Sequence, residues 1–576
     1  MADKSYFKTR VQMVTWTSAA AIVAAVAWRA LTLSSDAQCR CFPGDECWPS
    51  PASWAALNQS VHGALVATVP IGSPCHDTFP GVAYDAEKCG EIQANWPRPE
   101  LHEKTTHSVM ASIFANMSCD PFTPRDAPCE IGTYVPYAVN ASGAADYIKT
   151  IAFAKEHNIR LVVRNTGHDY MGKSTGAGAL ALWTHYIKGT RIFDYSSPAY
   201  RGKAMKIGAG VVAGEAQRAA TAEGYVVVEG DCETVGIAGG YTQGGGTSPL
   251  ASKFGLGSDQ VLEWEVVTAD GTLLTATPTQ NQDLYWALSG GGGGTYGAVL
   301  SMTVKLHKNM PTSAVTLSFT EVSDTFWDIL QIFIMNLPAA VDAGATLYWI
   351  VVPGNTFLMP QTYFPNGTAA EFRQLLQPTL LALDERKIEY AFNQMDFPTF
   401  EDTYNTLNPT MNISAINLGG RIIPRSLVTT KDSASDLVGA IHSMTDNLAA
   451  FAGISMNVGK PPTSPNAAHP AWRDSIALAF YGLQYDHTNY TANVEAQRVV
   501  NDILSPPLDK LVPGRAAYLN EANFGQADWQ SSFYGDNYEK LLVIKRKYDP
   551  NSVFWGSTAV GGEALQVAAD GRLCKA

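Results

Sequence analysis

Two nucleophilic side chains stand in loops framed by glycine. His168 lies in the segment RNTGHDY at 164–170, and Cys232 lies in GDCETVG at 230–236, which further glycines follow. Glycine has no Cβ, so a backbone rich in it lets a ligand come close. The pair therefore indicates one large cofactor held at two covalent points. Taken alone, His168 could equally be a hydrogen-bond donor to a phosphate or a histidine packed in the protein interior. Cys232 alone could be a buried, inert thiol.

Other motifs are weaker guides to chemistry. The loop 164–168 can present backbone N–H groups to a pyrophosphate, as glycine-rich nests do. The segment 292–297 spells a dinucleotide fingerprint, but a strand follows it, which favours a tight loop near a cofactor over a Rossmann nicotinamide site. The segment 172–176 spells Gly-x-Ser-x-Gly without the strand–turn–helix setting of a hydrolase, so we interpret it as a loop. No metal is predicted, because Cys39-Arg40-Cys41 lacks the further ligands that zinc needs.

Cysteine usage indicates an oxidising compartment. Seven of the nine cysteines precede the first glycine-framed loop, and with Cys574 they make eight, enough for four disulfides. Their pairing cannot be deduced from the sequence. The cysteine left over is Cys232. The nine positions are Cys39, Cys41, Cys47, Cys75, Cys89, Cys119, Cys129, Cys232 and Cys574.

The segment 1–37 has the pattern of a targeting sequence. A basic start precedes a largely apolar run at 11–27, and small residues at 35 and 37 offer a cleavage site. This favours a secretory signal peptide, with a signal anchor as the alternative because the run approaches spanning length. We therefore expect a secreted or lumenal protein that contacts membrane only if the segment is retained. Six glycosylation sequons agree with this, beginning at Asn58, Asn116, Asn140, Asn366, Asn412 and Asn489.

Length and charge limit the class of protein. At 576 residues the chain exceeds one hydrophobic core, so two or more domains are expected. The net charge of −13, with no lysine- or arginine-rich run, excludes a nucleic-acid partner.

Hydrophobic patterning predicts the elements around the loops. After a Cys-rich N-terminal extension over 38–125, we expect an α+β domain over 126–310. Its predicted elements are a helix at 144–157 capped by Ser142, strands at 160–163, 203–207, 260–268 and 300–306, and a hairpin turn at Asp270-Gly271. A second mixed region covers 311–510, with strands at 317–322 and 345–352 and helices at 371–383 and 434–449. A distinct tail covers 511–576, with a helix at 538–547.

Three loop segments and the tail carry a family resemblance. RNTGHDYMGKSTGAGAL at 164–180, GDCETVGIAGGYTQGGGTSPLASKFGLGSDQVL at 230–262 and LYWALSGGGGGTYGAVLSMTV at 284–304 resemble the FAD domain of the vanillyl-alcohol-oxidase type. Together with FYGDNYEKLLVIKRKYDPNSVF at 533–554, they look most like the secreted fungal berberine-bridge-enzyme-like oxidases. The resemblance covers 130–310 and 511–560, is weak through the middle and is absent in the N-terminal extension.

The resemblance implies a fold and a cofactor. The fold is a PCMH-type FAD-binding domain of two subdomains, a mixed α/β substrate domain, and a C-terminal segment that returns to the FAD domain. The cofactor is a bicovalent FAD, attached through His168 to the 8α-methyl carbon and through Cys232 to C6. These links would fix the ring and raise its redox potential.

The resemblance also assigns roles to individual residues. A valine at the position of Val235 implies access of dioxygen to the flavin, and the tail would add contacts from Tyr518 and Asn520. Thr247 departs from the family, where a histidine is usual, so a titratable donor is lost there. The predicted cofactor-binding residues are Arg164, Asn165, Thr166, Gly167, His168, Asp169, Cys232, Val235, Gly236, Gly239, Gly240, Gly244, Gly245 and Asn520.

The sequence favours an FAD oxidase that acts on a small organic substrate, a secondary metabolite by preference, with dioxygen as co-substrate. The candidate catalytic residues are Tyr518, Glu521 and Glu539, of which Glu539 fits a surface residue better. Tyr348, Trp349, Phe480 and Tyr481 fit either an aromatic sugar-binding groove or the core. Three alternatives stay open: a carbohydrate or alcohol oxidase, a redox-neutral isomerase or cyclase with a protonated glutamic acid as general acid, and a non-catalytic flavoprotein.

Overall fold

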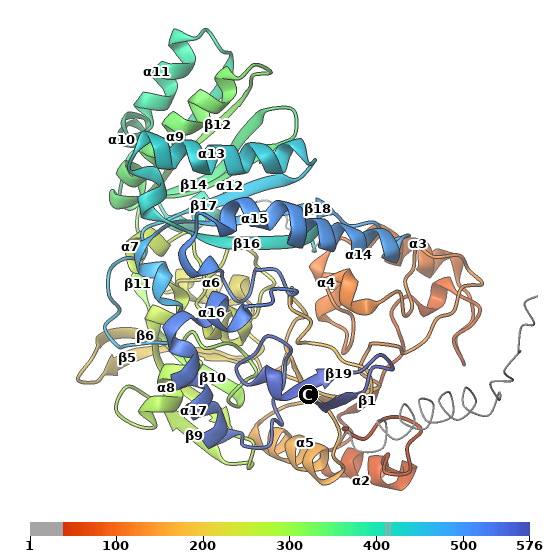
Figure 1. Cartoon of the computed structure of the whole chain (residues 1–576). Coiled ribbons are helices and arrows are strands. Elements are labelled where there is room, and N and C mark those ends of the chain that lie inside the picture. Colours follow the sequence, from red (N-terminus) through yellow and green to blue (C-terminus); the bar gives the residue numbers. More distant parts are fainter. Residues whose placement is uncertain (1–38, 409–411, 414–415) are drawn as a thin grey trace, which may run out of the picture.

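The computed structural model describes residues 39–408, 412–413 and 416–576. The predicted targeting segment at 1–37 lies outside this range. Within it, no helix is both long and apolar enough to cross a membrane. Figure 1 shows a lower body that carries the glycine-framed loops and the chain's C-terminal tail, and an upper body built on one large sheet.

Two sheets build the lower body. The smaller has strand order β1-β2-β4-β3, in which β2 (Tyr137–Asn140) and β3 (Leu161–Arg164) each pair in parallel with β4 (Leu180–Trp183), and β1 (Leu65–Ala67) pairs antiparallel with β2. The larger is antiparallel, with order β5-β6-β10-β8-β9. Its strands are β5 (Thr190–Ser196), β6 (Arg201–Gly208), β8 (Val261–Val267), β9 (Leu273–Ala276) and β10 (Ala298–Lys305).

These strands confirm the predicted pattern of the lower body. On β8, Trp264 is buried whereas Glu263 and Glu265 are half-buried. The predicted turn joins β8 to β9, and Gly271 takes the positive φ of 87° that the turn needs.

The predicted helix cap at Ser142 is wrong. Helix α5 (Ala144–Glu156) forms as expected, but its N-cap is Gly143, which makes no side-chain capping bond. The backbone N–H and hydroxyl of Ser142 both donate to the Asp146 carboxylate instead, at 2.9 and 2.7 Å. The Ser142 side chain is therefore engaged as a donor to the first turn and does not accept a hydrogen bond from a helix N–H, as a cap would.

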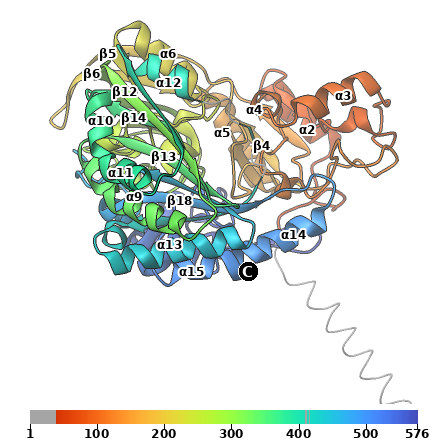
Figure 2. The ribbon, with the colours of Figure 1, turned by 90° about the horizontal axis from the view of Figure 1, so that it is seen from above.

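One seven-stranded antiparallel sheet forms the upper body, with order β15-β12-β14-β13-β17-β18-β16. Figure 2 shows helices α9 (Thr325–Asp342) and α13 (Lys431–Asp446), which pack on this sheet and on each other. The strands are β12 (Thr312–Thr320), β13 (Thr346–Val352), β14 (Thr356–Pro365), β15 (Tyr390–Phe397), β16 (Ile416–Pro424), β17 (Ala450–Ser455) and β18 (Ser475–Gln484).

The predicted helix at 371–383 is two helices. The structure separates α10 (Ala369–Leu375) from α11 (Gln377–Glu385), and Pro378 stands in the first turn of α11. Proline has no N–H to continue the hydrogen bonds of α10, and its ring excludes the carbonyl four residues earlier. Proline at the start of a helix is favourable, so α11 begins there.

The N-terminal extension and the tail both pack against the lower body. The extension carries α2 (Pro51–Ser60), α3 (Ala86–Asn95), α4 (Pro99–Glu103) and the short 3-10 helix η2 (Ser112–Ala115). In the tail, helix α17 (Tyr538–Tyr548) contacts α8 (Gln282–Leu288). Four disulfides are present and Cys232 is the free cysteine, as predicted. The pairs are Cys39–Cys574, Cys41–Cys47, Cys75–Cys89 and Cys119–Cys129.

Candidate cofactor and active site

A single large cavity gathers most of the predicted site residues. Its empty space, with the open mouth included, is about 1840 Å³. The loops after β3 and before η3 (Ile237–Tyr241) form much of its wall, and the tail forms the rest. The predicted residues that line it are Asn165, Thr166, Gly167, His168, Asp169, Cys232, Val235, Gly236, Gly239, Gly240, Tyr518, Asn520 and Glu521.

His168 and Cys232 meet in this cavity. The imidazole Nε2 of His168 lies 3.8 Å from Cys232 Sγ and 2.7 Å from Thr234 Oγ1. The Thr234 hydroxyl also lies 3.5 Å from the Cys232 sulfur, so one side chain positions both nucleophiles. Two loops that are distant in the chain therefore bring a ring nitrogen and a sulfur to adjacent points of one wall.

Burial sets the protonation of the two nucleophiles. Burial, with a smaller contribution from His102, lowers the pKa of His168 to about 3. Its imidazole is therefore neutral and keeps a lone pair at physiological pH. Burial raises the pKa of the Cys232 thiol, against an opposing effect of the Thr234 hydrogen bonds. Cys232 is thus a protonated thiol and not a preformed thiolate.

Glycines let the cavity loops approach one another closely. A Cβ on Gly236 would lie 2.6 Å from the amide oxygen of Asn165, and one on Gly293 would lie 3.0 Å from the Cα of Gly240. Gly293 and Gly294 also line the cavity, as expected for a tight loop that passes close to a cofactor. Any side chain at these positions would push the loops apart.

The tail adds a hydrogen-bonded pair to the wall. The Tyr518 hydroxyl accepts hydrogen bonds from the backbone N–H of Gly246 at 3.1 Å and from Asn520 Nδ2 at 2.8 Å. Asn520 Nδ2 also donates to the carbonyl oxygen of Gly240 at 2.8 Å. Both acceptor positions of the Tyr518 oxygen are thus filled, and its proton is available to a group in the cavity.

Two carboxyl groups line the cavity close to these side chains. Burial, with repulsion from Asp231, raises the pKa of Glu521 to about 8. Its Oε2 is buried and has no hydrogen-bond partner. Burial also raises the pKa of Asp231. The sequence analysis did not single out Asp231, although its place directly before Cys232 was a usable signal.

Four predicted site residues do not line the cavity. Arg164 is fully buried and donates to the carbonyl oxygens of Thr105 and Ser108 at 3.0 and 2.7 Å, so it fastens the first loop to the N-terminal extension. Gly244 and Gly245 lie behind the wall, where a Cβ on Gly244 would lie 2.5 Å from the Asn520 amide. Glu539 is exposed on α17.

Asp169 has a structural part within the first loop. Its carboxylate accepts hydrogen bonds from the backbone N–H groups of Met171 at 2.9 Å and Ser174 at 2.6 Å. These bonds fold the loop back on itself after His168. The Asp169 carboxylate therefore fixes the shape of this part of the wall. It forms no ion pair with the nearby ammonium group of Lys173.

Unsatisfied polar groups in the wall fit an FAD. The Ser174 hydroxyl and the Asn165 amide oxygen are buried without hydrogen-bond partners. Lys173 is the one lysine or arginine that lines the cavity among the described residues, and its ammonium group makes no hydrogen bond or ion pair with them. Burial lowers its pKa to about 8, and Asp169 opposes this. A diphosphate supplies the acceptors that Lys173 and Ser174 lack.

The same cavity offers surfaces for the rings of the cofactor. Leu161 and Val163 on β3 and Phe554 and Trp555 in the tail line it with apolar atoms, which suit an adenine ring. With the diphosphate donors and the two nucleophiles, the residues present fit FAD. Lys173 and Ser174 would hold its diphosphate, and His168 and Cys232 would contact its isoalloxazine.

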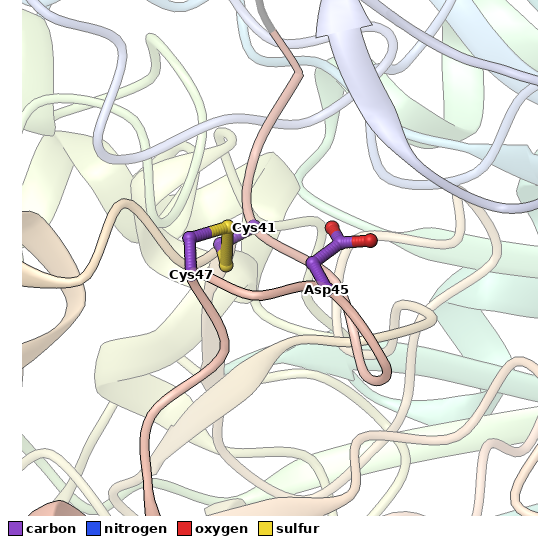
Figure 3. A group of neighbouring side chains, drawn as sticks. All are labelled: Cys41, Asp45 and Cys47. Atoms are coloured by element: carbon purple, nitrogen blue, oxygen red, sulfur yellow. A yellow bond between two sulfur atoms is a disulfide. The ribbon is translucent and has the colours of Figure 1, made fainter.

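One cluster with metal-ligand residue types has a structural explanation. The ligand atoms of Cys41, Asp45 and Cys47 lie within 4.8 Å of one another (Figure 3). However, Cys41 and Cys47 are joined in a disulfide, and Asp45 pairs with Arg572. Disulfide sulfurs are not thiolate ligands. The cluster therefore fastens the start of the extension to the end of the chain.

The aromatic residues of the upper sheet belong to the core. Tyr348, Trp349 and Tyr481 are buried in one hydrophobic cluster, and Phe480 packs against it. None of them lines the cavity. Thr247, which stands where the family has histidine, does line it, and its carbonyl oxygen accepts a hydrogen bond from Tyr241 at 2.8 Å.

Comparison with known proteins agrees with this site. A family model described as "FAD binding domain" matches residues 135–277, and one described as "Berberine and berberine like" matches residues 517–561. The FAD-linked oxidoreductase sor8 of Hypocrea jecorina is 47% identical over 94% of this chain and 94% of its own length. The bifunctional decalin synthase calF of Penicillium decumbens is 39% identical over 94% of this chain and 96% of its own length.

A solved structure has the same fold across nearly the whole chain. The crystal structure of the VAO-type flavoprotein MtVAO615 from Myceliophthora thermophila superimposes with a TM-score of 0.90 at 42% identity. The match covers 94% of this chain and 100% of that one. The α+β fold with a two-subdomain FAD-binding domain is thereby confirmed.

Proposed function

We propose that this chain, which belongs to the berberine-bridge-like, VAO-type FAD-linked oxidoreductases, is an oxidase that carries a bicovalent FAD. Its substrate is a small organic molecule of secondary metabolism, and dioxygen is its second substrate. The observation that carries the proposal is the 3.8 Å separation between His168 Nε2 and Cys232 Sγ inside a cavity that fits FAD.

The arrangement of the two nucleophiles supports double attachment. The 8α-methyl carbon and C6 lie on the same side of the isoalloxazine, so groups bonded to them must be near neighbours. The Thr234 hydroxyl is hydrogen-bonded to Nε2 of His168. Nδ1 is therefore the ring nitrogen that makes no hydrogen bond with the described residues. We assign Nδ1 of His168 to the 8α carbon and Sγ of Cys232 to C6.

Glu521 and Tyr518 supply the acid–base chemistry. When bound, the flavin accepts a hydride from the substrate at N5 and is reoxidised by dioxygen, which becomes hydrogen peroxide. Ionised Glu521 takes the substrate proton, since a pKa of about 8 lies near working pH. The Tyr518 hydroxyl donates a hydrogen bond to the substrate oxygen and orients it, and it keeps its proton. Val235 lines the cavity, where the family places dioxygen access.

The lining favours a metabolite over a carbohydrate. The aromatic residues that would form a sugar-binding groove are in the core of the upper body. Met110 and Ala111 line the cavity with apolar atoms. One relative is named a bifunctional decalin synthase, which supports a small carbon skeleton as the substrate.

A redox-neutral reaction is the second candidate, and Glu521 is the observation that favours it. With a pKa of about 8, Glu521 is mainly protonated at pH 7, and its Oε2 lacks a partner. A neutral carboxylic acid in a dry site can donate a proton. Turnover without dioxygen, without flavin bleaching and without peroxide would identify this alternative.

The disulfides support an oxidising compartment. Four disulfides form in oxidising surroundings. We therefore propose that the protein acts in the secretory pathway or outside the cell.

The proposed function is tested by anaerobic flavin reduction. The purified holoenzyme is mixed with a panel of hydroxylated small molecules, and the absorbance of oxidised flavin is followed before and after air is admitted. We expect bleaching by at least one compound and, on aeration, one peroxide for each flavin reoxidised. Reduction by sugars alone would overturn the metabolite assignment.

A further inference from the structure

Tyr404 connects the upper body to the loop that carries Cys232. It lies on helix α12 (Phe400–Leu407), and its side chain is fully buried. The Tyr404 hydroxyl donates to the carbonyl oxygen of Asp231 at 2.9 Å and lies 3.5 Å from that of Gly230. Asp231 is the residue directly before Cys232. A side chain from the upper body therefore holds the backbone next to one of the two nucleophiles.

A different anchor holds the loop on its other side. Directly after Cys232, the carbonyl oxygen of Glu233 accepts a hydrogen bond from the backbone N–H of Gly214 at 3.0 Å. Gly214 stands in the first turn of helix α6 (Ala213–Ala222), which belongs to the lower body. Cys232 thus lies between an anchor from the lower body and an anchor from the upper body.

The Tyr404 hydroxyl is the sole anchor of the stretch before the nucleophile. In the described part of the chain, no other residue hydrogen-bonds to the carbonyl oxygens of residues 230 and 231. Glu229 is fully buried just before them, and neither of its carboxyl oxygens has a hydrogen-bond partner. Burial, with repulsion from Glu233, raises the pKa of Glu229 well above its ordinary value, so this neutral group forms no ion pair that would fix the chain. Because position 230 is glycine, the stretch has unusual freedom to move without an anchor.

The packing of α12 fixes the position of the Tyr404 donor. Thr403, its neighbour, donates from its hydroxyl to the carbonyl oxygen of Thr312 on β12 at 2.9 Å. The Tyr404 ring packs beside that of Phe400, with centroids 5.9 Å apart, in the hydrophobic cluster of the upper body. Burial, with repulsion from Glu229, raises the pKa of Tyr404, so its hydroxyl stays protonated and remains a donor.

The position of this loop matters because Cys232 must bond to a single ring carbon. In the net reaction an S–C6 bond forms, while the S–H bond of Cys232 and the C–H bond at C6 break. Dioxygen takes up the two electrons and two protons that are released and becomes hydrogen peroxide. Small displacements of a reacting atom slow such a step strongly. The Tyr404 hydrogen bonds go to residues 230 and 231 and not to the loop 164–170 that carries His168.

We propose that Tyr404 is a positioning residue that places Cys232 for attachment to C6 of the isoalloxazine. This inference rests on the proposed function, because it presupposes a flavin that bonds to Cys232. Tyr404 does not line the cofactor cavity, so it acts through the backbone of Asp231. It is a point at which the upper body is coupled to the cofactor loops, and a change elsewhere in the upper body leaves this bond in place.

Two single-link backgrounds separate the two attachments. His168→Ala leaves Cys232 as the one link, and Cys232→Ala leaves His168. Each is combined with Tyr404→Phe, which keeps the ring and removes the hydroxyl. Full-length protein from flavin-starved cells is mixed with FAD, and the flavin retained in the acid-precipitated pellet is followed over time. We expect Tyr404→Phe to slow Cys232 attachment about fivefold to tenfold, the effect of one hydrogen bond, and to change the rate of His168 attachment by less than about twofold.

Tyr481→Phe is the matched control. Tyr481 is a second buried tyrosine of the upper body, and its hydroxyl is hydrogen-bonded to that of Ser505 at 2.9 Å. This variant also removes one buried hydrogen bond, but none that reaches the Cys232 loop. Both attachment rates should therefore stay those of the parent proteins. Melting temperature verifies that each variant is folded.

Two results would overturn this inference alone. One is an equal rate of Cys232 attachment with and without the Tyr404 hydroxyl. The other is an equal slowing of both attachments, which would indicate a general loss of structure. A His168→Ala parent that retains no flavin would instead contradict the double attachment of the proposed function, and this inference with it.

Discussion

The lower and upper bodies contribute to the site in different ways. The lower body and the tail line the cofactor cavity with backbone, glycines and the side chains of two loops. The upper body lines a second, much smaller cavity beside it with side chains from strand β16 and helix α14 (Tyr490–Val499). The residues that fit a cofactor thus lie on loops that approach one another closely, whereas residues 311–510, as far as the structure describes them, contribute Asn412 to the wall of the cofactor cavity. Changes in the two bodies should therefore have separable effects.

The largest expected effect comes from Glu521, which lines the cofactor cavity. Glu521→Gln keeps the shape and removes the ionisable group, so substrate-driven flavin reduction should slow by about 10²–10⁴-fold. Stopped-flow absorbance under anaerobic conditions measures the rate. Glu539→Gln, on the exposed face of α17, is the matched control and should react at the wild-type rate. An unchanged rate for Glu521→Gln would remove this residue from the mechanism.

A core change in the upper body should affect stability and leave the cofactor untouched. Ile441 on α13 is fully buried. Ile441→Ala should lower the free energy of unfolding by roughly 2–5 kcal/mol through lost burial and a cavity. Denaturant unfolding gives this value, and the flavin spectrum should stay that of the wild type. A shifted flavin spectrum would show that the two bodies are not separable in this way.

Substitution of Lys173 tests how the lower body binds the diphosphate. Lys173→Met removes the charge, so covalent loading at limiting FAD should fall about 10–100-fold, the worth of a charge-assisted hydrogen bond. Loading by riboflavin, which has no phosphate, should be equally poor in both proteins. Lys308→Met, at an exposed site on β11 (His307–Lys308), is the control. Flavin fluorescence in the denatured protein gives the readout, and equal FAD loading would contradict the assignment.

The pH dependence separates the two candidate reactions of the same cavity. Burial and Asp231 raise the pKa of Glu521 to about 8, so this group is protonated below and ionised above that pH. As a base, Glu521 makes flavin reduction about tenfold faster at pH 9 than at pH 7. As a general acid in a redox-neutral reaction, it makes turnover faster at pH 7. Initial rates across pH 6–10 decide between them.

The sequence was most informative where backbone geometry demands one residue type. Glycine at 236 and 293 reflects the near contact of two loops, and this requirement is visible without a structure. The free Cys232 could be predicted because an odd number of cysteines leaves one unpaired, and Cys232 is the one that lies in a glycine-rich loop. The alternation of apolar and charged residues along β8 likewise predicted a strand with one buried face. These parts of the fold and site were predictable from local pattern alone.

Other features depend on contacts between distant segments. The roles of Arg164 and Gly244 behind the wall follow from the extension and the tail packing against the loops. The buried, unpartnered side-chain atoms of Ser112, Asn417 and Gln497 come from three separate elements, and no local pattern marks Asn417 or Gln497. The split between α10 and α11 did have a local signal, since Pro378 interrupts the predicted helix. Disulfide pairing is set by the fold and not by spacing.

Flavin attachment tests the central claim most directly. Acid-precipitated holoenzyme should give a yellow pellet, and His168→Ala and Cys232→Ala should each retain one attachment, with distinct absorption spectra. The double variant should release all its flavin into the supernatant. A colourless wild-type pellet, or a double variant whose pellet stays yellow, would contradict the account of a ring held by His168 and Cys232.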